Sequence, residues 1–192
     1  MKIFAFDRRP GSALLLPPSV ELLADSAVVA PDRPLFLPDF DTDWEAHFYL
    51  CGRVSRLGKD IALKFAPRYF DAVSLAMRLV PRSLVNDFRL SGRQTGLLGV
   101  FDCCLQLGQW QTVDPTTADD KPLTVTVGQA TQTIDDPLKA IAESLSAISR
   151  YATLKTGDLL LALHLDFSLP ATVGDNVTAT LASTPVLSAR IK

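Results

Sequence analysis

Polar and apolar residues alternate along residues 39–53, DFDTDWEAHFYLCGR. The polar positions are every second residue from 41 to 47: Asp41, Asp43, Glu45 and His47. In a β-strand every second side chain lies on the same face, so these four groups would share one face. Carboxylates and an imidazole on one face are suited to a divalent cation, but they are equally expected on the wet side of a half-buried strand.

Strand-like patterns dominate the rest of the chain. They cover residues 2–6, 47–53, 109–113, 122–134, 157–167, 174–183 and 185–191, and the strand at 47–53 is expected to end at Gly52. Residues 10–40 contain six prolines, at 10, 17, 18, 31, 34 and 38. Because proline removes a backbone donor, this segment predicts edge strands and turns rather than central sheet.

One helix is predicted from its start signal. Asp135 or Asp136 is placed to cap it, and Pro137 falls in the first helical turn. Its apolar stripe, which predicts core packing, is formed by Leu138, Ile141, Ala142, Leu145 and Ile148. Residues 61–90 are ambiguous, because their apolar spacing suits a helix while Pro67 and Pro81 interrupt it.

These elements predict an α+β protein, mostly β, in a single domain. Residues 1–40 form a divergent proline-rich N-terminal segment of that domain, and residues 41–192 form the remainder. The chain has 192 residues, of which 47% are hydrophobic, and a net charge of −2. This composition argues against a disordered chain and against a nucleic-acid partner.

The composition also indicates a compartment. No apolar run approaches the length of a membrane helix, and the N-terminal run is too short for a signal peptide. Three cysteines occur without a CxxC pair: Cys51, Cys103 and Cys104. Reduced thiols in a cytoplasmic protein are therefore expected, without a membrane partner or a cysteine-based zinc site. Cys103 and Cys104 lack a neighbouring base, which favours buried thiols over a nucleophile.

Five stretches follow one another in an order that resembles a known family. They are GRV at 52–54, YFDAVSLAMRLVPRSL at 69–84, VFDCCLQLGQW at 100–110, LKTGDLLLALHL at 154–165 and VGDNVTATL at 173–181. Their order and spacing resemble the fumarylacetoacetate hydrolase family, in its small acylpyruvate-hydrolase and hydroxyheptadienedioate-isomerase branch. The resemblance covers about 140 of the 192 residues. It implies that family's C-terminal-domain fold, a β-roll of mixed sheets with few helices, with a strand at residues 69–79.

The resemblance also implies a magnesium or manganese ion held by a Glu-x-Glu pair and a later Asp. Such an ion would polarise a 1,3-dicarbonyl or 2-oxo acid for hydrolysis or isomerisation. Here Arg78 stands at the position of the metal-binding Asp, and Gly99 at that of the family lysine. Ala162 and His164 replace the two threonines of the TGTP loop, and the N-terminal segment has no family counterpart. No cofactor is therefore expected, and magnesium or manganese only if the site has been rebuilt.

The position of the Glu pair depends on the alignment. Without gaps it falls on Trp44 and Ala46, which cannot bind metal, and a shift of one residue gives Glu45 and His47. A larger shift gives Asp43 and Glu45, the weak candidates for metal ligands. The family placement implies a strand near residues 45–53 that lines the cavity. Arg78 would then lie near Glu45 or Asp43, where a guanidinium could replace the ion and bind a ligand.

Two histidines are weak candidates for catalysis. His47 and His164 lie on strands that border the cavity in the family, and His164 shares a strand face with Asp166. Structural histidines are the plainer alternative. Four arginines could bind a small carboxylate ligand: Arg8, Arg9, Arg78 and Arg82. Surface and structural ion pairs are the alternative for these.

Two functions follow. The first is a degenerate member of the family that has lost metal-dependent catalysis and acts as a non-catalytic binding or partner protein, as a homodimer. The second is an active hydrolase or isomerase on acylpyruvate-like 2-oxo or 1,3-dicarbonyl acids, with a site rebuilt from Glu45, His47, Arg78 and His164. Arg78 discriminates between them, because a cation does not ligate a metal ion.

Overall fold

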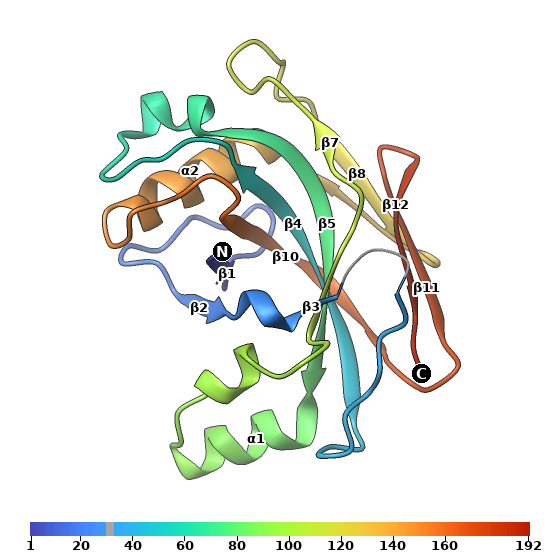
Figure 1. The fold of residues 1–192 in the computed structure, drawn as a ribbon. Helices are drawn as coiled ribbons and strands as arrows, with labels where there is room; N and C mark the ends of the chain where they lie inside the picture. Colours follow the sequence, from blue (N-terminus) through green and yellow to red (C-terminus); the bar gives the residue numbers. More distant parts are fainter. Residues whose placement is uncertain (30–32) are drawn as a thin grey trace.

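Three long strands form the centre of the protein. The computed structural model describes residues 1–29 and 33–192, and its longest strands are β4 (Trp44–Val54), β5 (Phe70–Pro81) and β10 (Leu159–Pro170). β4 lies between the other two and pairs antiparallel with both. Figure 1 shows that all three are strongly curved. The predicted α+β class with mostly β structure is confirmed.

The described residues form one large sheet of eight strands. Its order is β2-β1-β10-β4-β5-β6-β3, with β7 also paired to β5. The short strands are β1 (Ile3–Phe6), β2 (Val20–Leu23), β3 (Val28–Val29), β6 (Leu105–Leu107) and β7 (Gln111–Thr112). β2 and β3 lie at the edges, as the proline-rich segment predicts, although Pro31 lies outside the described residues. β1 is paired parallel to β10, so the N-terminal segment is part of this sheet.

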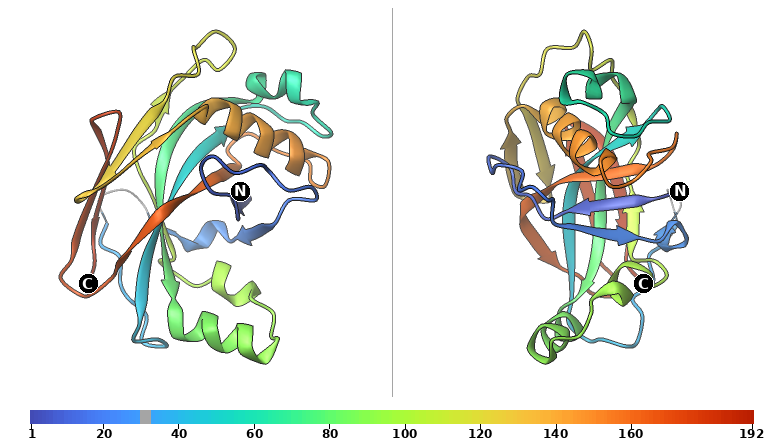
Figure 2. Two further views of the ribbon diagram at one scale, coloured as in Figure 1. Left: turned by 180° about the vertical axis from the view of Figure 1, so that it is seen from behind. Right: turned by 90° about the vertical axis from the view of Figure 1, so that its left-hand side faces the viewer.

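A second sheet of four strands packs against the first (Figure 2). Its order is β12-β11-β8-β9, and its strands are β8 (Leu123–Val127), β9 (Ala130–Ile134), β11 (Asn176–Leu181) and β12 (Thr184–Arg190). Inward side chains such as Val125, Val177 and Leu187 join the same buried cluster as Phe48 and Leu75 of the large sheet. The two sheets therefore share one apolar core.

The alternation in β4 separates two environments. Trp44, Ala46, Phe48 and Leu50 are buried in that shared core. The intervening side chains lie on the opposite face of the sheet, where a smaller apolar cluster includes Tyr49 and Cys51. β4 continues to Val54 and does not end at Gly52 as predicted, because Gly52 and Arg53 still pair with β5.

Residues 61–90 contain three different elements. A 3-10 helix, η2 (Leu63–Tyr69), leads into β5, and helix α1 (Arg82–Ser91) follows. The strand at 69–79 implied by the family resemblance is thus confirmed, and the helical periodicity is misleading there. β5 is buried on both faces between two sheet neighbours, so its nearly continuous apolar sequence mimics a buried helix. Two further 3-10 helices are η1 (Asp25–Ala27) and η3 (Gly96–Gly99).

Helix α2 (Pro137–Ser149) covers one face of the large sheet. Ile141, Ala142, Leu145 and Ile148 are buried in the core, as the apolar stripe predicts. Asp136 holds the N-cap position, as predicted, but it has φ of 49° and its side chain makes no capping hydrogen bond. Asp120 serves instead, since its carboxylate accepts hydrogen bonds from the backbone N–H groups of Leu138 and Lys139, each at 2.8 Å. In the described part of the chain, no helix has the length and apolar character to cross a bilayer.

Two Gly-Asp turns precede β10 and β11. Gly157 and Gly174 have φ of 88° and 101°, a backbone conformation that favours glycine. Asp158 is only 2% exposed and accepts hydrogen bonds from the N–H groups of Lys2 at 2.8 Å and Lys155 at 2.9 Å. Burial alone would raise the pKa of Asp158, but the ammonium and N–H of Lys2 lower it overall. Asp175 makes the equivalent turn bond to the Thr172 N–H at 2.8 Å, and it has no ion pair among the described residues.

An Asp→Asn substitution is predicted to lower the free energy of unfolding by different amounts in these two turns. Asp158→Asn removes the charge that faces Lys2 and leaves a buried N–H without an acceptor, so we expect a loss of about 2 kcal/mol of unfolding free energy. Asp175→Asn is the matched control, and its half-buried turn should lose under about 1 kcal/mol. Urea denaturation at pH 7 measures both values. Equal losses would contradict the structural importance assigned to Asp158.

Candidate functional site

Polar side chains from neighbouring strands gather on the face of the sheet opposite α2. The cross-strand register places His47 of β4 opposite Arg78 of β5, and Tyr49 of β4 opposite His164 of β10. We name this group the polar cluster, and it consists of Glu21, Glu45, His47, Tyr49, Arg78 and His164. Of the residues in the three alignments considered, Glu45 and His47 lie in this cluster, whereas Trp44 and Ala46 lie in the apolar core.

Arg78 is the centre of the polar cluster. It is 7% exposed, and its guanidinium binds Glu21 of β2 through two contacts, Nη1–Oε2 at 2.7 Å and Nη2–Oε1 at 2.8 Å. Nη2 also donates to the backbone carbonyl of Leu98 at 3.1 Å. Burial alone would lower the pKa of Arg78, but the Glu21 carboxylate raises it, so the side chain remains charged. Nε has no hydrogen-bond partner among the described residues.

The predicted pairing of Arg78 with Glu45 or Asp43 is wrong. Those two carboxylates face Arg82 at the start of α1, with Nη1–Oε1 of Glu45 at 3.3 Å and Nε–Oδ2 of Asp43 at 3.7 Å. The register explains the difference, because Glu45 lies opposite Val80 and Asp43 precedes the strand. Arg78 points instead toward the edge strand β2.

His47 and His164 lie together, as they would have to if both contributed to one site. Their rings stack with centroids 4.8 Å apart, and the His164 ring also stacks on Tyr49 at 4.5 Å. Nε2 of His47 is 3.0 Å from Oε2 of Glu45. Asp166 does not join them, because its side chain bonds Gln132 of β9. A β-bulge between His164 and Ser168 breaks the alternation on which the His164–Asp166 pairing rested.

Burial makes both imidazoles reluctant to take a proton. It lowers the pKa of His47, although the Glu45 carboxylate acts in the opposite direction. The pKa of His164 falls to about 3 because it is buried near Arg9, His47 and Arg78. Burial also raises the pKa of Tyr49, against the effect of Arg78. At neutral pH the stacked rings are therefore neutral, and the charges of the polar cluster reside on Arg78 and the two glutamates.

The four candidate arginines have different environments. Arg8 pairs with Glu143 of α2 at 2.7 Å, and Arg78 and Arg82 also face carboxylates. Arg9 donates to the backbone carbonyl of Leu165 and has no ion pair within residues 1–29 and 33–192. Three of the four arginines thus already hold a carboxylate of the chain itself.

The structure leaves no room for a side chain at Gly99, the position that the resemblance matches to the family lysine. A Cβ atom at Gly99 would lie 2.6 Å from the backbone oxygen of Leu22 and 3.3 Å from Oε1 of Glu21. No real Cβ makes a backbone contact of 2.6 Å, so a lysine would require β2 or η3 to move. The backbone of β2 occupies the space that a side chain at Gly99 would need. The same strand carries Glu21, which binds Arg78.

The residues present do not fit the divalent metal that the resemblance implies. A hard cation needs several oxygen ligands, and the described residues contain no group of three or more His, Cys, Asp or Glu side chains placed to hold an ion. Glu45 and His47 supply one carboxylate and one imidazole, and the third position holds the Arg78 guanidinium. These side chains do not form a divalent-metal site.

The cysteines are thiols in apolar surroundings. Cys51 and Cys104 are buried and Cys103 is only half-buried, so the expectation that both neighbours are buried is wrong for Cys103. Burial raises the pKa of Cys104 to about 11, with Arg78 acting in the opposite direction, which makes a thiolate nucleophile unfavourable.

Two residues of the polar cluster are missed by the sequence analysis. Glu21 is the single acidic residue of the apolar run VELLA, and a carboxylate in such a run is a signal for a buried partner. Tyr49 reads as an ordinary core residue, and only the register with β10 places its ring against His164.

Solved structures with the same fold are numerous. A fumarylpyruvate hydrolase from Pseudomonas aeruginosa, in complex with Mn²⁺ and pyruvate, is 20% identical, with a TM-score of 0.83 over 100% of this chain and 89% of that chain. A 2-hydroxyhepta-2,4-diene-1,7-dioate isomerase from Mycobacterium marinum is 22% identical, with a TM-score of 0.80 over 99% of this chain and 73% of that chain.

A protein from Yersinia pestis described as belonging to the fumarylacetoacetate hydrolase family is 19% identical, with a TM-score of 0.82 over 100% of this chain and 92% of that chain. No family model and no curated protein matches the sequence. The order of motifs and the structure agree: the chain has the fold of the fumarylacetoacetate hydrolase family.

Proposed function

We propose that the chain is a divergent member of the fumarylacetoacetate hydrolase family that no longer carries out metal-dependent catalysis and instead binds a small carboxylate ligand. The observation that carries this proposal is the Arg78–Glu21 pair. A buried guanidinium is held there by two short contacts, at the position that the family resemblance matches to the third metal ligand. A guanidinium has hydrogen-bond donors but no free lone pair, so it cannot supply a ligand to a divalent cation there.

The ligand class follows from the charges of the polar cluster and from the related structures. Arg78 and Glu21 offset each other, and Glu45 faces Arg82. Arg9 lies close enough to lower the pKa of both histidines, and it has no carboxylate partner in the described ranges. The Pseudomonas aeruginosa neighbour holds pyruvate. A small 2-oxo carboxylate beside Arg9, with neutral imidazoles as hydrogen-bond partners, is therefore the ligand we assign.

One observation favours the alternative of an active hydrolase or isomerase. Glu45 orients His47 at 3.0 Å, and a carboxylate–imidazole pair of this kind serves as a general base in many enzymes. Such a base would act without a metal on acylpyruvate-like acids. The same preparation tests both proposals.

Thermal melting separates a metal site from a ligand site. We expect no change of melting temperature between EDTA, Mg²⁺, Mn²⁺ and Zn²⁺, because Arg78 occupies the position where the resemblance places a cation ligand. Pyruvate should raise the melting temperature, since a ligand that binds only the native state adds about 2.7 kcal/mol at a hundredfold excess over its dissociation constant. Acetamide is the uncharged control. Elemental analysis of the purified protein accompanies the series.

The contrary outcomes are distinct. A Mg²⁺ or Mn²⁺ shift that Glu45→Ala abolishes would establish a rebuilt metal site, and a shift with Zn²⁺ alone would point to His47 and His164. Turnover of acylpyruvates or oxaloacetate in EDTA, lost in His47→Gln, would support the alternative enzyme. No response to pyruvate would remove the proposed ligand class.

The Arg78–Glu21 pair predicts strong coupling. Arg78→Met leaves the Glu21 carboxylate without a partner and should cost about 3 kcal/mol of unfolding free energy. Adding Glu21→Gln should recover much of this loss, because the unpaired charge is removed with its partner. Arg82→Met, in an exposed pair, is the control and should cost under about 1 kcal/mol. Chemical denaturation measures the cycle, and additive losses would contradict the coupling.

His164 predicts a dependence of stability on pH. Its pKa of about 3 in the folded chain lies below the ordinary 6.5, so the unfolded chain binds more protons between these values. Stability is therefore lost as the pH falls below 6.5. Between pH 7 and pH 5, His164 should account for a loss of up to about 2 kcal/mol. His164→Phe keeps an aromatic ring on Tyr49 and should flatten this part of the profile, whereas parallel profiles for both proteins would contradict the assignment.

A further inference from the structure

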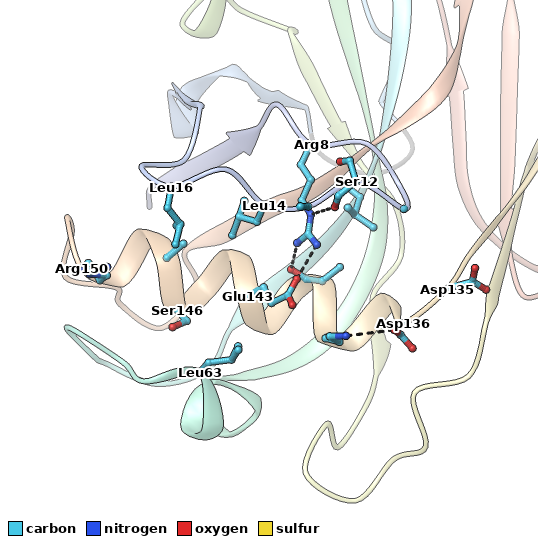
Figure 3. Close-up of a pocket in the computed structure, with 16 residues that line it drawn as sticks. Arg8, Ser12, Leu14, Leu16, Leu63, Asp135, Asp136, Glu143, Ser146 and Arg150 are labelled. Atoms are coloured by element: carbon cyan, nitrogen blue, oxygen red, sulfur yellow. Dashed lines mark hydrogen bonds and ion pairs between the residues drawn. The ribbon is translucent and has the colours of Figure 1, made fainter.

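A cavity of about 730 Å³ lies on the α2 side of the large sheet, away from the polar cluster (Figure 3). Four separate segments line it: the loop at residues 8–16, Leu63 of η2, residues 135–150 along α2, and Leu163 of β10. Its volume falls within the range of small-molecule sites, about 300–1,000 Å³. Neighbouring residues face opposite ways here, since Leu163 lines the cavity while His164 lies in the polar cluster.

An ion pair holds the loop against the helix. The Arg8 side chain is 10% exposed, and its Nη2 is 2.7 Å from Oε2 of Glu143. Nη1 donates to the backbone carbonyl of Ala140 at 3.4 Å, and Nε donates to that of Ser12 at 3.2 Å. Every nitrogen of this guanidinium thus bonds within the chain. The cavity wall is therefore a fixed part of the fold, and Arg8 is not available to a ligand.

The apolar lining is concentrated at one end. Figure 3 shows Leu14, Leu16 and Leu63 around the stretch of α2 that runs from Glu143 past Ser146 to Arg150. Leu16 and Leu63 are 64% and 48% exposed, which leaves two large apolar side chains in water at the rim. An apolar ligand group placed between them would remove this surface from water, at about 25 cal/mol per Å². This end of the cavity favours an aliphatic or aromatic group.

Among the charged residues that line the cavity, one arginine at the apolar end lacks an ion-pair partner in the described part of the chain. Arg8 pairs with Glu143, and Lys139 pairs with Asp136 at 3.6 Å. Arg150 is exposed and has no ion pair in the part of the chain that the structure describes. The C-terminal end of a helix carries a partial negative charge, so a ligand anion would be repelled there without this arginine. With Arg150, a carboxylate finds a guanidinium beside the apolar wall.

We propose that this cavity is a second ligand site, for an amphipathic monocarboxylate. The apolar group lies between Leu14, Leu16 and Leu63, and the carboxylate meets the guanidinium of Arg150. The site does not depend on the polar cluster or on the small carboxylate assigned to it. The site should therefore bind an anionic amphiphile more tightly than a cationic one, because the positive charge of a cationic amphiphile would be repelled by Arg150.

Titration of the ¹⁵N-labelled full-length chain with octanoate tests the site. We expect shifts of the amide signals of residues 13–16, 63 and 143–150, and weaker binding of octanol and octylamine, which have the same chain without the carboxylate. Arg150→Gln should weaken octanoate binding about tenfold, the loss expected for one charge-assisted hydrogen bond. Octanol binding should stay unchanged in this variant. Arg89→Gln changes the matching exposed arginine in the last turn of α1 and should leave both affinities unchanged.

The apolar wall needs its own variant. Leu16→Ser lies on an exposed loop position, so the fold should tolerate it, and it should weaken octanoate and octanol alike. Octylamine binding more tightly than octanoate would overturn the ligand class. Octanoate binding that is unaffected by both Arg150→Gln and Leu16→Ser, or signal shifts confined to the polar cluster, would overturn the site.

Discussion

The register of β4 between β5 and β10 is the constraint on which the molecule depends. This strand pairs with a neighbour on both sides along nearly its whole length, so its side-chain alternation is imposed on the centre of the sheet. One set of residues builds the core that α2 and the second sheet share. The other set, which includes Glu45, His47 and Tyr49, builds the polar cluster. A shift of one residue would exchange these environments, and the burial of Trp44 and Phe48 prevents it.

The polar cluster has a different electrostatic basis from the metal site that the family resemblance implies. A divalent ion collects several carboxylates around one positive centre. Here the positive centre is the covalently attached Arg78, and one carboxylate, Glu21, is enough to satisfy it. The edge strand β2 supplies that carboxylate, and its closeness to Gly99 removes the room for a lysine. The position that the resemblance matches to the family lysine and the buried Arg78–Glu21 pair are therefore linked through the same edge strand.

The family features that survive are those that the backbone needs. Gly157 and Gly174 adopt positive φ angles, and Asp158 satisfies two buried N–H groups at the start of β10. Such requirements follow from chain geometry and do not depend on a substrate. The structure can therefore be close to that of a solved neighbour, with a TM-score of 0.83 at only 20% sequence identity. The Gly-Asp motifs are therefore informative about the fold, whereas Arg78 is informative about the groups present in the polar cluster.

The sequence by itself determined the class, most of the strands, helix α2 and the order of motifs that identifies the fold. These depend on local alternation, on proline and glycine geometry, and on residues close together in the chain. It also placed Arg78, His47 and His164 in one region, through the family resemblance. Only the tertiary structure decided that Arg78 binds Glu21, 57 positions away, that Asp120 caps α2, and that Tyr49 stacks on His164. Each of these pairs joins segments whose approach depends on sheet order and strand register, and no local pattern encodes either quantity.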